Sequence, residues 1–303
     1  MRITQRSMVN ASLAGLNGNL SQLTKVQNQL ATGKVLNRPS DSPIDTNKAM
    51  QTRSDMARVS QQARNISDAT SRLNQTDSAL AGLQTLVQRV QALTVQGLNT
   101  GANSATSSAA LATEVTAIRE DMLGVANTTI SGRPVFGGVT AGNTAYDQDG
   151  GYVGLGNGGT DDHPVNRRIS DAESLRIDVT GPEVFGDDTA GADLFSLVQG
   201  IADKLNTSPV DPVALGADLD ALAAAQARIS TAQATVGART NRVEKAAELS
   251  SARQFTLTSQ LKDLEDVDVA KASVELSAQQ LGYQAALSVT AKILQPTLMD
   301  FLR

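Results

Sequence analysis

The 303-residue chain has no cysteine and no tryptophan, and it has only one histidine, three tyrosines and five phenylalanines. Without cysteine, disulfide bonds and thiolate chemistry are excluded. The scarcity of aromatic side chains favours slender packing of Ala, Leu and Val over a thick globular core. The net charge of −5 argues against a general nucleic-acid binder, which would carry a basic surface.

Long apolar runs are also missing. No stretch approaches the roughly 18 apolar residues needed to span a bilayer, so no membrane insertion is expected. Residues 1–40 contain five basic residues and no acidic one, but they lack the apolar run and small-residue cleavage site of a secretory signal. If the protein leaves the cell, we expect a route that needs no cleaved signal peptide.

What the chain does have is a sustained heptad pattern. The spacing predicts long helices over residues 47–98 and 211–264 and a shorter one over 106–127. A helix of about 50 residues is roughly 75 Å long, and a period near 3.5 implies a partner helix along its length. We expect the two long helices to pair, although an ordinary bundle core would explain any single stripe. Counted in sevens, the later stripe reads Leu222, Ile229, Val236, Val243, Ser250, Leu257 and Leu264.

The middle of the chain, residues 138–192, has a different composition. It holds 11 of the 24 glycines and ten acidic against three basic residues. In SLRIDVT (174–180) the apolar Leu175, Ile177 and Val179 alternate with polar residues, which predicts a half-buried strand. After this region, residues 194–205 are typical of a short amphipathic helix. The middle is therefore predicted to be a small β-rich insertion.

The predicted fold is mainly α: a long antiparallel, coiled-coil-like helical bundle formed by both chain ends, with a small β-rich inserted domain. Three parts follow from the composition. Residues 1–35 and 265–303 form a terminal coiled-coil tier. Residues 36–137 and 193–264 form a long-helix core domain, and 138–192 form an outer β-rich domain.

The terminal tier supplies the predicted interaction residues. Apolar residues recur there at helical spacing, with nothing to cover them but each other and neighbouring molecules. The predicted assembly interface consists of Leu13, Leu16, Leu20, Leu23, Leu30, Leu276, Tyr283, Leu287, Leu294 and Phe301. Between the two tiers, turn and helix-breaking residues interrupt the pattern. The predicted inter-tier hinge consists of Gly33, Asn37, Arg38, Pro39, Ser40, Asp41, Ser42 and Pro43.

Residues that could carry chemistry are few. His163 has no second histidine or cysteine to complete a metal or catalytic site. Asp161-Asp162 and Asp187-Asp188 lack the spacing of a calcium loop. GLGNGG (154–159) matches a dinucleotide fingerprint, but the acidic TDDHPVN follows it where a helix should begin. We therefore expect no catalytic, cofactor or metal site, and no enzyme.

Several motifs resemble the bacterial flagellin superfamily, closely at both ends of the chain and weakly in the middle. Two details are similar to its hook–filament junction members rather than to filament flagellins. SDSP (40–43) stands where flagellins usually carry an Asp-Asp-Ala-Ala-Gly-like segment, and the chain begins MRIT rather than with an Ile-Asn-Thr-Asn-like stretch. The matching motifs are MRIT, LATGKVLNRPSDSP (30–43), LVQRVQALTVQGLN (86–99), ANTTISGRPVFGG (126–138), GARTNRVE (237–244), LEDVDVAKASVELS (264–277) and ILQPTLMDFLR (293–303).

This resemblance implies a secreted structural protein of the bacterial flagellum that serves motility. It implies export by the flagellar type III export apparatus, with a dedicated export chaperone bound to the C-terminal region. It also implies an extracellular ring of identical subunits at the distal end of the hook, between hook-associated protein 1 and the first flagellin subunits. Two alternatives stay open: a filament flagellin, and an intracellular coiled-coil adaptor.

Overall fold

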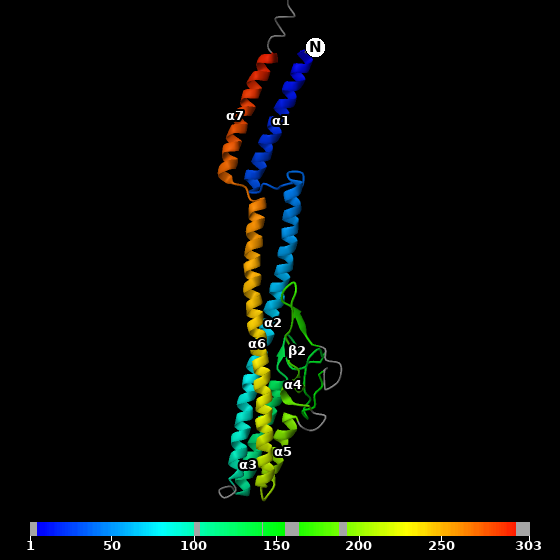
Figure 1. The fold of residues 1–303 in the computed structure, drawn as a ribbon, viewed down its shortest axis with the longest axis vertical. Helices are drawn as coiled ribbons and strands as arrows, with labels where there is room; N and C mark the ends of the chain where they lie inside the picture. The colour runs from blue at the N-terminus through cyan, green and yellow to red at the C-terminus, as the bar shows by residue number, and fades with distance from the viewer. Residues whose placement is uncertain (1–4, 100–103, 141, 155–163, 188–192, 295–303) are drawn as a thin grey trace, which may run out of the picture. The chain divides into compact units, whose positions relative to one another are not determined.

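The computed structural model describes residues 5–99, 104–140, 142–154, 164–187 and 193–294. Most of them are helical, and the long helices pack against one another, so the predicted mainly α fold is confirmed (Figure 1). The helices are α1 (Gln5–Thr32), α2 (Pro43–Leu98), α3 (Ala105–Ala126), α4 (Gly181–Phe185), α5 (Leu194–Asn206), α6 (Pro212–Glu265) and α7 (Val269–Leu294). The strands are β1 (Thr129–Ile130), β2 (Arg133–Pro134), β3 (Asn166–Arg168) and β4 (Ser174–Arg176).

The chain divides into two compact units. The terminal unit contains residues 1–59 and 253–303, and the central unit contains residues 60–252. Helices α2 and α6 each begin in one unit and end in the other. The division of the chain into three functional parts stays a prediction.

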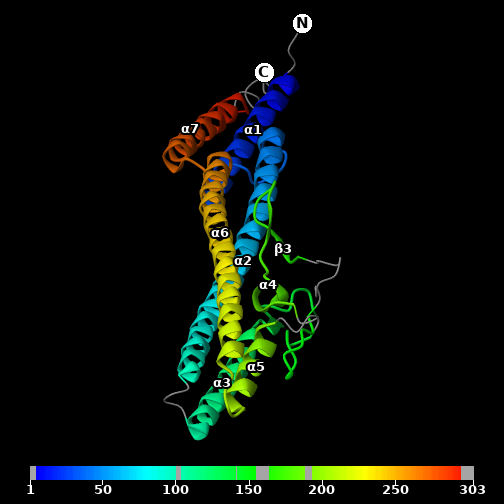
Figure 2. The same ribbon diagram turned by 60° about the horizontal axis from the view of Figure 1, so that its bottom comes forward.

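The core of the central unit is built where the heptads predict it. Helices α2 and α6 run side by side, with α3 and α5 beside them (Figures 1 and 2). Their apolar stripes join in one continuous hydrophobic core. On α6 the predicted stripe is fully buried at Leu222, Ile229, Val236 and Val243, so these side chains remove their whole apolar surface from water.

Two short antiparallel hairpins lie between α3 and α4. Strand β1 pairs with β2, and β3 pairs with β4. The strand expected over 174–180 is shorter than predicted, because β4 ends at Arg176. Beyond it Asp178 is buried rather than exposed: its Oδ1 accepts hydrogen bonds from the Val165 amide and from Arg176 Nε, both over 3.0 Å. These partners explain how a charged residue lies inside without its charge being left uncompensated.

Five of the eight aromatic residues gather where this insertion meets the helices. Tyr146 lies at the centre, with ring centroids 5.2 Å from Tyr152, 5.1 Å from Phe185 and 5.0 Å from Phe195 of α5. Edge-to-face and tilted contacts of this kind add about 0.5–1.5 kcal/mol per pair beyond the burial of area. The insertion and the helices therefore share a core, and neither buries its apolar surface alone.

In the terminal unit α1 and α7 pack along each other and run in opposite directions (Figure 1). On each helix the less exposed residues follow a four–three spacing, which is the period of a two-helix seam. On α1 they are Val9, Ser12, Leu16, Asn19, Leu23, Val26 and Leu30, and Gln29 next to Leu30 is also partly buried. On α7 they are Ala272, Leu276, Gln279, Tyr283, Ala286 and Thr290.

Candidate assembly surface

The predicted interface residues fall into two groups. One group, Leu16, Leu23, Leu30, Leu276 and Tyr283, is partly buried in the seam that α1 and α7 form within the chain. The structure brings these residues together, and their packed sides are covered by the partner helix of the same chain. They are therefore less available to a neighbouring molecule than the sequence indicates.

The other group faces outward. Leu13 and Leu20 lie seven residues apart beside the seam and are exposed, and so is Leu287. The side chains of Leu294 and Phe301 lie outside the part of the chain that the structure describes. The outward-facing residues keep the role that the sequence suggests for the whole set, and that role stays a prediction.

Helix α7 also carries an apolar stripe that the sequence reasoning missed. Val274, Leu281 and Val289 are 71%, 70% and 55% exposed, and the exposed Ala278 and Ala285 lie between them. We call these five residues the free stripe. At about 100° per residue, the free stripe lies on the side of α7 opposite the seam. Val274 and Leu281 are seven residues apart, and this heptad spacing could have indicated a second apolar face of the helix from the sequence alone.

An apolar face of this kind has an energetic consequence. Fully burying one Val or Leu side chain contributes about 1.5–3 kcal/mol, so the three large residues would contribute several kcal/mol if a neighbour covered them. A helix that is apolar on two opposite sides is typical of a position between two partners. Within the described chain, α1 supplies only one of them.

The predicted hinge, residues 33–43, is held by many local contacts. Gly33 ends α1 with φ +70°, the left-handed conformation that glycine adopts at helix ends. Asp41 Oδ2 accepts the backbone amides of Arg38 (2.9 Å) and Asn37 (3.3 Å). These hydrogen bonds, first of all the one from Arg38, hold the pKa of Asp41 below its ordinary value.

Ser42 then starts α2. Its Oγ accepts the Asp45 amide (3.4 Å) and donates to the Asp45 carboxylate (2.7 Å), with Pro43 as the first helical residue. This is the arrangement of a capped helix start. The remaining predicted hinge residues, Pro39 and Ser40, are exposed in the turn. The hinge role of this segment stays a prediction.

A buried carboxylate joins this segment to the end of α6. Glu265 is nearly inaccessible, and Lys34 Nζ and Arg53 Nη2 each lie 2.7 Å from one of its oxygens. Burial alone would raise the pKa of Glu265, but the hydrogen bonds and charges of Lys34 and Arg53 outweigh burial and lower it. Glu265 is therefore ionised at neutral pH, and it connects α6, α2 and the segment after α1.

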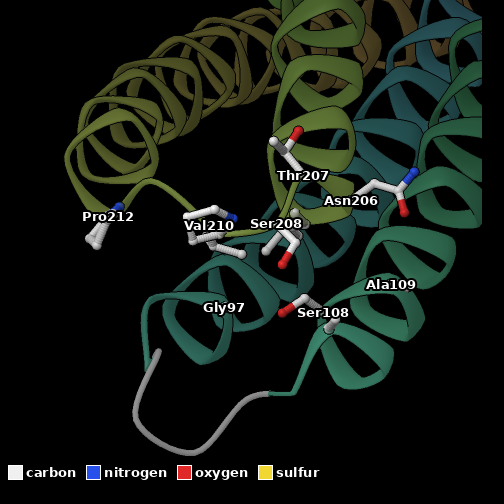
Figure 3. A pocket seen from close by; sticks show the side chains of 11 residues that line it. Gly97, Ser108, Ala109, Asn206, Thr207, Ser208, Val210 and Pro212 are labelled. Atoms are coloured by element: carbon white, nitrogen blue, oxygen red, sulfur yellow. The ribbon is translucent and has the colours of Figure 1, made fainter.

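The described residues offer no obvious chemistry. Figure 3 shows a pocket of about 410 Å³ between the end of α2, the start of α3 and the α5–α6 connection. None of the described residues that line it has an ionisable side chain, so they provide no acid–base group. In the described ranges no cluster of His, Cys, Asp or Glu could hold a metal ion, and no helix is long and apolar enough to cross a membrane. His163, Asp161, Asp162, Asp188 and most of GLGNGG lie outside those ranges.

The chain matches two family models that together cover more than two thirds of its length. These are the bacterial flagellin N-terminal helical region at residues 3–140 and the C-terminal helical region at residues 219–302. It is 27% identical to Flagellar hook-associated protein 3 of Escherichia coli, covering 94% of this chain and 96% of that protein. It is 26% identical to Flagellin of Bacillus subtilis, covering 96% of both chains.

Solved structures agree on the fold. The crystal structure of Bacillus cereus FlgL superposes with a TM-score of 0.59 at 24% identity, covering 70% of this chain and 99% of that one. The matched regions include both chain ends, which carry the seam, the free stripe and the Glu265 contacts. The relatives are structural proteins and none is an enzyme. The chain therefore belongs to the bacterial flagellin family and is a structural component of the flagellum.

Proposed function

We propose that this protein forms the hook–filament junction, as a ring of identical subunits at the distal end of the hook, outside the cell. The single observation that carries the proposal is that α7 is apolar on two opposite sides and that α1 covers only one. In the ring, a neighbouring axial subunit covers the free stripe. The partners are hook-associated protein 1 on one side and the first flagellin subunits on the other.

Assembly of this kind suits a secreted subunit. The free stripe is modest in size, so the separate subunit tolerates its exposure, while repetition around a ring adds the contribution of every copy. We propose export through the flagellar type III apparatus, with an export chaperone on the C-terminal region. A chaperone that covered the free stripe would prevent association before export.

A filament flagellin is the second candidate, because Flagellin of Bacillus subtilis matches the chain over nearly its whole length. The SDSP segment and the MRIT start support the junction protein instead. In this chain Ser42 of that segment caps α2 together with Asp45 of the helix itself. With the family established, an intracellular coiled-coil adaptor is no longer an alternative.

Deletion of the gene in the bacterium that carries it separates the two candidates. Loss of a junction protein leaves hooks intact without filaments, and flagellin accumulates unpolymerised in the medium. Loss of a sole flagellin leaves hooks without filaments and no flagellin in the medium. Filaments of normal number and length after the deletion would contradict both roles.

A further inference from the structure

A groove runs along α6 in the central unit, beside residues 179–183. It has a volume of about 560 Å³, and small residues of α6 form its floor. The hydroxyl groups of Thr231 and Thr235 each donate to the carbonyl four residues earlier over 2.9 Å. Their hydroxyl hydrogens are used within the helix, and the small side chains of the floor leave room for another backbone to approach closely. The lining residues include Glu183, Arg228, Thr231, Thr235 and Arg239.

The groove also holds an arginine without an anion. The Nε–H group of Arg228 is buried and has no hydrogen-bond acceptor, and Arg228 forms no ion pair with the described residues. The other charges in the groove are engaged: Arg239 donates to the carbonyl of Asp178, and Glu183 pairs with Arg176 at 3.1 Å. Leaving a buried donor without an acceptor carries a free-energy cost. An acidic occupant would remove that cost.

Helix α3 has a complementary outer face. Every exposed side chain on it is no larger than threonine, except for Glu120 and Asp121. Among the described residues neither carboxylate has a hydrogen-bond or ion-pair partner. Apart from these two residues the face carries only short side chains, which lets two helix axes approach to about 8–10 Å. Ala117 is one of the small exposed residues and lies one helical turn before Glu120 and Asp121.

We propose that the outer face of α3 of a second copy docks in this α6 groove and brings Glu120 and Asp121 to Arg228. The groove and the α3 face are different surfaces of one chain, so the contact is head-to-tail. Contacts of that type propagate around a ring. The inference rests on the proposed function and specifies how neighbouring central units meet.

The absence of cysteine makes the contact directly measurable. A chain carrying both Thr231→Cys and Ala117→Cys is expressed in cells that lack the chromosomal gene, and isolated flagella are mildly oxidised. We expect disulfide-linked dimers and higher oligomers of this chain on a non-reducing gel. The matched control pairs Thr231→Cys with Ser78→Cys, which lies on the exposed face of α2, and we expect no oligomers from it.

Charge reversal gives the second measurement. Arg228→Glu in the Thr231/Ala117 double-cysteine chain should lower the cross-linked fraction at least about fivefold, and adding Asp121→Arg should restore most of it. Filaments retained on hooks without cross-linking, or cross-linking through Ser78 instead, would overturn this contact while leaving the junction role standing. If the double-cysteine chain is absent from the isolated flagella even on a reducing gel, both the contact and the junction role would be overturned.

Discussion

Lys34 Nζ donates a 2.7 Å hydrogen bond to Glu265 Oε2, joining the segment after α1 to the last residue of α6. Two backbone hydrogen bonds flank this contact: the Val35 amide donates to the Glu265 carbonyl (2.7 Å), and the Val267 amide donates to the Gly33 carbonyl (2.9 Å). The two connections that lead to the terminal helices are therefore fastened to each other. If this region bends, the connection after α1 and the connection after α6 must therefore move together.

Replacing Glu265 by Gln should loosen this junction. The amide keeps the shape of the side chain but loses the charge that Lys34 and Arg53 face. Since both cations are about half exposed, they return to water at little cost, and we expect a loss of about 1–2 kcal/mol. Hydrogen exchange of the Val35 and Val267 amides should become about tenfold faster or more. Unchanged exchange at both amides would contradict the role assigned to the carboxylate.

The same contact predicts a dependence on pH. A carboxyl group whose pKa is lowered by folding stabilises the folded state above its unfolded pKa, and that contribution is lost as the pH falls through the folded pKa. Protection of the Val35 and Val267 amides, corrected for intrinsic exchange rates, should therefore be constant near neutral pH. It should decrease once the pH falls below 4.5, the ordinary pKa of a glutamate. The Glu265→Gln chain should lack this acid step. An equal step in both chains would assign it to other groups.

The buried stripe of α6 predicts a large effect in the central unit. Val236→Asp or Val243→Asp would place an unpaired charge at a fully buried position, which is expected to cost several kcal/mol. Asn241→Asp is the matched control, because Asn241 is exposed on the same helix. Arg242 is unsuitable, since it pairs with Glu173. Thermal unfolding followed by helical circular dichroism would measure the difference, and equal melting of all three variants would contradict the core.

Gly181 predicts a steric effect at the aromatic cluster. A Cβ at this position would lie 2.4 Å from Tyr146 Oη and 2.7 Å from a Tyr152 ring carbon. Gly181→Ala should therefore destabilise the chain by about 1–3 kcal/mol and change the near-ultraviolet circular dichroism of the tyrosines. Gly82→Ala is the control: a Cβ there meets open space within a helix, so it should be neutral or stabilise by up to about 1 kcal/mol. The reverse order of stability would contradict the packing.

The sequence predicted the helices well because periodicity and capping are local. The helix expected over 211–264 is α6 at Pro212–Glu265, and the one expected over 194–205 is α5 at Leu194–Asn206. The strand over 174–180 was predicted less well. Its end depends on Asp178 finding the Val165 amide and Arg176 as partners, and one of these is 13 residues away.

The assembly residues show a second limit of sequence reasoning. Leu276 and Leu281 are both apolar residues of α7, and the heptad pattern does not state which one faces α1. Only the packed pair of helices separates the half-buried Leu276 from the exposed Leu281. Similarly, the polar segment after α1 was correctly predicted to interrupt the helices, but its attachment to Glu265 spans 231 residues of sequence.

The most direct measurement uses Leu281→Asp, supplied as purified protein to hooks on cells that lack the gene, so that export plays no part. Because Leu281 is 70% exposed, the variant should melt within about 0.5 kcal/mol of the original chain. It should nevertheless leave hooks without filaments and flagellin unpolymerised in the medium. Gln280→Asp, exposed on α7 outside the free stripe, should support filament growth normally. Normal filament attachment by Leu281→Asp would contradict the role of the free stripe in forming the junction.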